Sequence, residues 1–60
     1  MNYGIYFGEK LVAVGRDAML LSYYLTLPHY KRNNAEMREI DAVTADAFRA
    51  EWEPKGFTMN

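Results

Sequence analysis

The chain has 60 residues and a mass of 7.0 kDa, half of its residues are hydrophobic, and its net charge is −1. A chain this short forms at most one domain, so we expect residues 1–60 to be a single domain with a small core. The lack of cysteine excludes a disulfide framework and thiolate metal sites. No stretch approaches the roughly 20 apolar residues that span a bilayer, and the start lacks the pattern of a signal peptide. These features predict a cytoplasmic protein that binds no membrane.

Aromatic residues make up 15% of the chain, a large share for a small interior. Each aromatic side chain buries roughly 150–250 Å² when it is covered. We therefore expect some rings, mainly tyrosines, to remain on the surface, because Tyr and Trp are enriched at protein interfaces. The alternative interpretation is that the rings simply extend a small core.

Charge is unevenly distributed along the chain. Residues 1–35 carry a net charge of +2, and residues 36–60 carry a net charge of −3. Neither half has the strong field of one sign that is typical of a protein that binds duplex DNA or mimics it.

Residues 3–15 have the pattern of a β-hairpin. Both arms are rich in strand-forming residues, and a two-residue type II′ turn would place Gly8 at its first central position. In this register Ile5 would pair with Val12. The face that we expect to form the core carries Tyr3, Ile5, Phe7, Val12 and Val14.

The run over residues 19–27 fits two structures. As a strand over about 20–27, it alternates apolar residues with more polar ones. As a helix, it could begin with Asp17 as its N-cap. Pro28 would stop either element, and residues 28–34 would follow as a polar connection. We favour the strand, because its tyrosines and Thr26 fit a pleated surface.

A C-terminal amphipathic helix is expected over about 34–53. Asn33 and Glu36 have the spacing of a capping box, and Pro54 and Gly56 are typical stop signals. The alternative is a fourth strand over 37–43 and a shorter helix over 45–53 with Thr44 as its cap. The density of charges in residues 36–43 favours the single helix. Its apolar face includes Met37, Ile40, Phe48 and Trp52.

These elements predict an α+β fold, in which one helix covers one face of a three-stranded antiparallel sheet. The sheet would consist of the hairpin and the strand over about 20–27. Its other face would be open to solvent or to a partner, and it would carry Tyr6, Leu11 and Tyr24.

Few residues could carry catalysis or hold a cofactor. The chain has one serine and one histidine, Ser22 and His29, and a catalytic triad would need Asp41 or Asp46 as its third member. No Gly-x-Ser-x-Gly pattern surrounds Ser22. Metal-ligand spacing and phosphate-binding glycine motifs are also missing. The sequence therefore indicates a protein that is not an enzyme and needs no cofactor.

The opening of the chain has the sequence Tyr3-Gly4-Ile5-Tyr6-Phe7-Gly8-Glu9-Lys10-Leu11-Val12-Ala13-Val14-Gly15. It resembles the start of many short accessory proteins of phages of Gram-positive bacteria, which often begin Tyr-x-x-Tyr-x-Gly-acid-Lys, followed by aliphatic residues, Ala, an aliphatic residue and Gly. Residues 23–32 are similar to the later aromatic-Pro-aromatic-basic segment of those proteins. The chain lacks their Lys/Glu-rich helix between the two segments, and its end is acidic where theirs is basic. The resemblance implies an accessory protein that binds and blocks a host or defence protein in the host cytoplasm.

The leading hypothesis is a small non-catalytic protein-interaction module, a phage-type inhibitor of a larger host or defence protein. A homodimer through the same face would also cover apolar surface. The alternative is a single-stranded nucleic-acid-binding protein, in which sheet tyrosines and the basic loop over residues 29–34 stack on bases and contact phosphates. The predicted contact residues are Tyr6, Leu11, Tyr24, Tyr30, Lys31 and Arg32.

Overall fold

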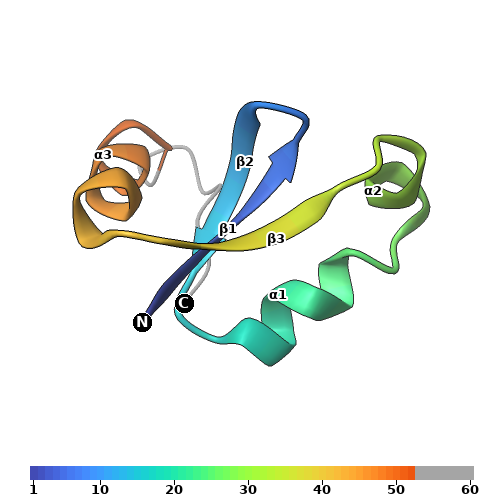
Figure 1. The fold of residues 1–60 in the computed structure, drawn as a ribbon, viewed down its shortest axis with the longest axis horizontal. Helices are drawn as coiled ribbons and strands as arrows, with labels where there is room; N and C mark the ends of the chain where they lie inside the picture. Colours follow the sequence, from blue (N-terminus) through green and yellow to red (C-terminus); the bar gives the residue numbers. More distant parts are fainter. Residues whose placement is uncertain (53–60) are drawn as a thin grey trace.

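The computed structural model describes residues 1–52, with the side chain of Trp52 excepted, and these residues form an α+β fold (Figure 1). The three strands form an antiparallel sheet in which β1 lies between β2 and β3. The expected fold class is therefore confirmed. Pro54, Gly56 and the tail after them lie outside the described residues. The elements are β1 (Asn2–Phe7), β2 (Lys10–Gly15), α1 (Ala18–Tyr24), α2 (Pro28–Arg32), β3 (Glu36–Ile40) and α3 (Ala42–Trp52).

The hairpin expected over residues 3–15 is present as β1 and β2. Gly8 in its turn has a φ of 65°, and Glu9 does not have a positive φ. This combination fits the type II′ turn, which needs a left-handed residue only at its first central position.

The pairing of the two strands departs from the predicted register after the first two pairs. A β-bulge at Val12 shifts the register, so that Ile5 faces Ala13 rather than Val12. Because a bulge adds one residue to one strand, every later residue of β2 changes face. Val14 therefore pairs with Gly4, and its expected place on the same face as Ile5 was wrong.

Residues 18–24, which were expected to lie in a strand, form helix α1. The Oδ1 atom of Asp17 accepts hydrogen bonds from the backbone N–H groups of Met19, at 3.0 Å, and Leu20, at 3.3 Å. The helix also buries Leu21 completely. The N-cap and this buried leucine explain why the helix forms despite the alternating pattern.

The segment after α1 contains a second short helix where a polar connection was expected. Pro28 occupies the first turn of α2, where its missing N–H costs no hydrogen bond. The helix ends at Arg32. The Nδ2 atom of Asn33 donates to the carbonyl of His29 at 2.8 Å, and Asn34 has a φ of 54°. Asn33 therefore helps to close α2 instead of starting the expected long helix.

The single helix expected over 34–53 was wrong, and the split alternative describes the chain better. Residues 36–40 form β3, which is the third strand of the sheet in place of 20–27 and pairs with the free edge of β1. Backbone pairing along β1 outweighs the charges of this strand. Helix α3 then begins after Asp41, whose Oδ1 atom accepts a hydrogen bond from the N–H of Thr44 at 2.7 Å. Asp41 is thus the N-cap of α3, a role that the alternative prediction gave to Thr44.

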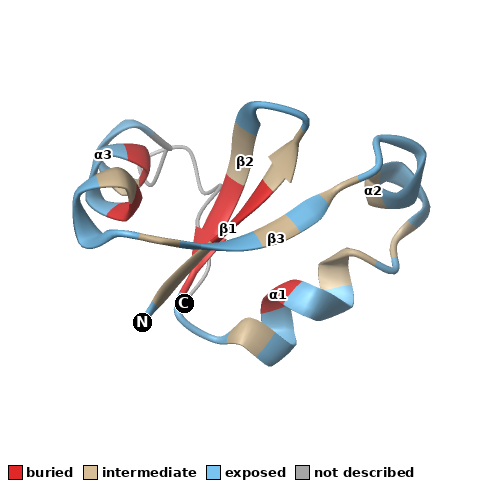
Figure 2. Cartoon of the chain, viewed as in Figure 1, coloured by how far each residue is buried: buried red, intermediate tan, exposed pale blue. Residues whose placement is uncertain are grey.

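Helices cover both faces of the sheet, whereas one covered face was expected. Helix α1 packs against one side of β1 and β2, and α3 packs against the other side (Figure 1). Figure 2 shows that the buried residues concentrate on β1, β2 and the inner sides of α1 and α3. The buried hydrophobic residues are Ile5, Ala13, Val14, Leu21, Ala45 and Phe48.

Candidate protein-interaction surface

The structure does not bring the six predicted contact residues onto one face. Tyr6 and Leu11 are paired across the hairpin, on the side of the sheet where α3 packs. A Cβ atom on Gly4 would lie 2.6 Å from Cδ1 of Leu11, so Leu11 rests on the backbone of β1. Tyr24 and Tyr30 pack instead against the core cluster on the α1 side. The predicted set is therefore divided between the two faces.

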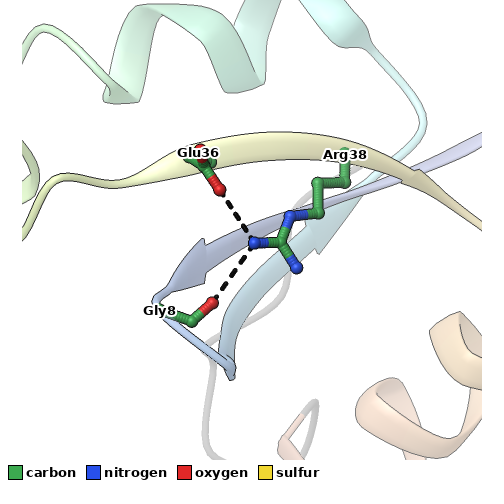
Figure 3. Close-up of polar contacts among 3 residues, drawn as sticks. All are labelled: Gly8, Glu36 and Arg38. Atoms are coloured by element: carbon green, nitrogen blue, oxygen red, sulfur yellow. Dashed lines mark hydrogen bonds and ion pairs between the residues drawn. The ribbon is translucent and has the colours of Figure 1, made fainter.

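The ring of Tyr6 is covered by Arg38 of β3. The guanidinium carbon of Arg38 lies 4.5 Å from the ring centroid of Tyr6, within the range of a cation–π contact. The Nη2 atom of Arg38 donates to Oε1 of Glu36 at 2.8 Å and to the carbonyl of Gly8 at 3.4 Å (Figure 3). The hydrogen bond with Glu36 raises the pKa of Arg38. Tyr6 thus has a partner within the chain.

Five aromatic rings on the opposite side form a continuous row, which we call the aromatic row. Its ring centroids are 6.1 Å apart from Tyr23 to Tyr24 and 6.0 Å apart from Tyr24 to Tyr30. Phe7 lies 5.4 Å from Tyr30 and 5.6 Å from His29. Every contact is edge-to-face, the arrangement that the charge distribution of aromatic rings favours. The row connects α1 to α2 across the end of β1.

Burial within this row affects the pKa of one tyrosine. Burial of Tyr30, together with its neighbour Tyr24, raises the pKa of the Tyr30 hydroxyl. A tyrosine hydroxyl is already protonated at neutral pH at its ordinary pKa, so the raised pKa leaves Tyr30 a hydrogen-bond donor and acceptor.

The outer side of α1 exposes large apolar side chains. Met19 is 83% exposed, Tyr23 is 61% exposed and Leu20 is 41% exposed. Tyr23 follows Met19 by four residues and Leu20 by three, so the three side chains share one helix face. The sequence predicts this exposed apolar face only if residues 19–27 are treated as a helix. The expected strand over these residues did not predict it. Apolar side chains that gather on a surface often mark an interaction site.

Helix α2 adds positive charge beside the aromatic row. Lys31 and Arg32 are exposed, and within residues 1–52 neither side chain forms an ion pair. Arg38 and Arg49, in contrast, each have a carboxylate oxygen within 4 Å. Residues 18–35 contain no Asp or Glu. We call the exposed set of Met19, Leu20, Tyr23, His29, Lys31 and Arg32 the α1–α2 surface.

The residues considered for catalysis have other contacts. Oγ of Ser22 donates to the carbonyl of Met19 at 2.8 Å, and the ring of His29 packs against Phe7 and Tyr30. The hydrogen bonds from Thr44 lower the pKa of the Asp41 carboxyl, consistent with its capping role. In the part of the chain that the structure describes, no three His, Asp or Glu side chains gather where a metal ion could be held.

The structure is a small three-stranded α+β domain in which α1 exposes apolar side chains and α2 exposes two cations. No family model matches the chain, and neither a curated protein nor a solved structure matches it. No helix in the described residues has the length and apolar character to cross a membrane.

Proposed function

We propose that this chain is a small non-catalytic protein-interaction module, which binds a larger protein through the α1–α2 surface. The observation that carries the proposal is the exposure of Met19 and Tyr23 beside the aromatic row. Tyr supplies a large contact area with little loss of conformational freedom, and Met adapts its shape to the surface it meets.

The charge of this surface indicates the chemistry of the partner. Lys31 and Arg32 give residues 18–35 a net charge of +2, because no acidic residue lies between Asp17 and Glu36. An acidic partner surface would pair with these two cations, and Arg32 could bind a carboxylate through two parallel hydrogen bonds. An apolar group of the partner would pack on Met19 and Tyr23.

The consequence of binding follows from the resemblance of the first half of the chain to phage accessory proteins. A domain of this size would act by occupying a surface of a host or defence protein and so blocking it. The proposed blocking of a host or defence protein is based on the resemblance to phage accessory proteins. The proposed location of the contact is based on the exposed residues of α1 and α2.

Selection from a displayed library of random peptides tests the proposed surface. We expect the enriched peptides to combine acidic residues with aromatic or aliphatic ones, and to lose binding to the Lys31→Glu/Arg32→Glu variant. Lys10→Glu is the matched control, because Lys10 is also an exposed cation but lies in the hairpin. Val43→Ser controls for an exposed apolar side chain on α3. Enriched peptides that bind all of these variants equally would contradict the proposal.

One observation favours the alternative function, binding of single-stranded nucleic acid. Tyr30 and His29 lie beside Lys31 and Arg32 in one short helix, and aromatic rings beside cations suit stacked bases and phosphates. Two cations would give a weak salt dependence, because the slope follows the number of phosphates neutralised. Titration with a labelled oligothymidine at several salt concentrations tests this. Binding that is tighter than that of any selected peptide would favour it over a protein partner.

A further inference from the structure

The outer edge of β3 is open in the part of the chain that the structure describes. β3 is the last strand in the sheet order β2-β1-β3 and pairs with β1 on one side only. Figure 1 shows no helix or strand in front of β3. An open edge presents unpaired backbone N–H and C=O groups, which can pair with a strand from another molecule.

The side chains of β3 alternate between the two sides of the sheet. Glu36 and Arg38 lie on the side of Gly4 and Tyr6, because they pair directly with these residues of β1. Met37 lies on the other side and packs against the core cluster. Glu36 and Arg38 are exposed, so both remain accessible to a neighbouring strand.

We propose that β3 pairs antiparallel with β3 of a second copy of this chain, with the two-fold axis at Met37. In this register Glu36 of each copy lies opposite Arg38 of the other copy, and the two Met37 side chains face each other. Oppositely charged residues that lie directly across an antiparallel pair stabilise it. The two sheets then form one continuous sheet.

The charges select this register over its neighbours. Residues that face each other in an antiparallel pair have their side chains on the same side of the sheet. Because side chains alternate along a strand, the two facing residues of identical strands are an even number of positions apart. The two-fold axis therefore passes through a residue and not between two residues. An axis at Arg38 would place two arginines opposite each other, and an axis at Glu36 or Glu39 would do the same with two glutamates. Of these positions, only an axis at Met37 avoids like charges.

The ion pair within each chain fits this arrangement. Arg38 and Glu36 are 2.8 Å apart in one chain, on the same side of the strand. In the dimer the four side chains would alternate in sign around the axis, so each carboxylate would have one arginine in its own chain and one in the other. Charges on an edge strand usually prevent pairing, and here they limit it to one register.

A charge-exchange experiment tests the dimer separately from the α1–α2 surface. Glu36→Arg and Arg38→Glu each place like charges opposite each other in a homodimer. Mixed together, the two variants restore both opposite pairs in a heterodimer, although neither variant keeps the ion pair within its own chain. Sedimentation velocity at increasing concentration should show self-association of the unaltered chain, weaker association of each variant alone, and recovery in the mixture. Lys10→Glu in the hairpin should leave self-association unchanged.

Crosslinking provides a second measurement that does not disturb the charges. The chain has no cysteine, so Met37→Cys introduces a single thiol at the proposed axis. Opposite residues in an antiparallel pair are close enough for a disulfide. We expect Met37→Cys to form a disulfide-linked dimer on oxidation much faster than Val43→Cys, whose thiol would be highly exposed on α3. Equal rates for the two variants, or a mixture of charge variants that stays monomeric, would overturn the proposal.

Discussion

Tyr6 and Tyr23 lie on opposite sides of the same small sheet and have different surroundings. Tyr6 is covered by Arg38, which Glu36 and the Gly8 carbonyl hold in place. Tyr23 touches Tyr24 at one edge and is otherwise largely exposed. A surface tyrosine can thus be satisfied by its own chain or left for another molecule. The aromatic content of the chain alone therefore does not locate a binding surface. The surface is located by asking which rings are covered by other groups of the same chain and which are left exposed.

Removing the contact that holds α1 to the sheet should have the largest effect. Leu21 is fully buried in the cluster with Ile5 and Ala13. We expect Leu21→Ala to lower the free energy of unfolding by about 2–5 kcal/mol, because it removes packed methyl groups and leaves a cavity. Leu20→Ala, on the exposed side of the same helix, is the control and should cost far less. Urea denaturation followed by circular dichroism measures both, and equal losses would contradict the assigned helix orientation.

Loss of the cap of α1 should be the next largest effect. Asp17→Ala removes the acceptor of two backbone hydrogen bonds and should cost about 0.5–2 kcal/mol of stability. Asp17→Asn should cost much less, because Asn is an equally good N-cap. A strand over residues 20–27 would predict no difference between the two variants in the same denaturation experiment.

Uncovering Tyr6 would reduce the contrast between the two tyrosines. Arg38→Ala removes the cation over the ring and should cost about 0.5–1 kcal/mol, as expected for an exposed cation–π contact. Arg38→Lys keeps the charge but loses the planar stacking, so its loss should be intermediate. The ring resonances of Tyr6 in NMR spectra should shift in Arg38→Ala, and resonances that stay unchanged would show that Arg38 does not cover the ring.

Acidic pH should destabilise helix α3, because it protonates the Asp41 carboxylate that caps the helix. The hydrogen bonds from Thr44 hold the pKa of Asp41 below its ordinary value in the folded chain. A carboxyl whose pKa is lower in the folded chain than in the unfolded chain stabilises the fold at any pH above its ordinary pKa. This stabilisation is lost as the pH falls through the folded-state pKa. We expect Asp41→Asn to remove this part of the acid dependence in denaturation curves measured from neutral to acidic pH. An unchanged pH profile would contradict the role of the carboxylate.

The smallest effect on stability is expected on the α1–α2 surface itself. Lys31 and Arg32 form no ion pairs within residues 1–52, so the Lys31→Glu/Arg32→Glu variant should unfold within about 0.5 kcal/mol of the original chain. Its peptide binding should nevertheless be lost. A large loss of stability would show that the two cations have a structural role.

The sequence predicted well those features that depend on residues close together in the chain. The hairpin followed from its strand-forming arms and Gly8, and the three-stranded α+β class was also confirmed. The third strand was misplaced because the alternation over residues 19–27 fits a helix as well. Which segment pairs with the free edge of β1 depends on long-range packing that local patterns do not contain.

The candidate surface was only partly predictable for the same reason. Tyr30, Lys31 and Arg32 are neighbours in the chain, so they stay together in α2. Their grouping with Tyr6 failed because helices cover both faces of the sheet. Met19 and Leu20 were missed because their exposure follows from the helical geometry of α1.

NMR mapping of bound peptide tests the central claim most directly. Isotope-labelled protein would be titrated with an acidic peptide that carries an aromatic residue, and backbone shifts would be assigned along residues 1–52. We expect the largest shifts at Met19, Tyr23 and residues 29–32, with little change at Tyr6, Arg38 and Val43. Shifts confined to α3 or to the Tyr6 side of the sheet would contradict the assignment of the α1–α2 surface as the binding site.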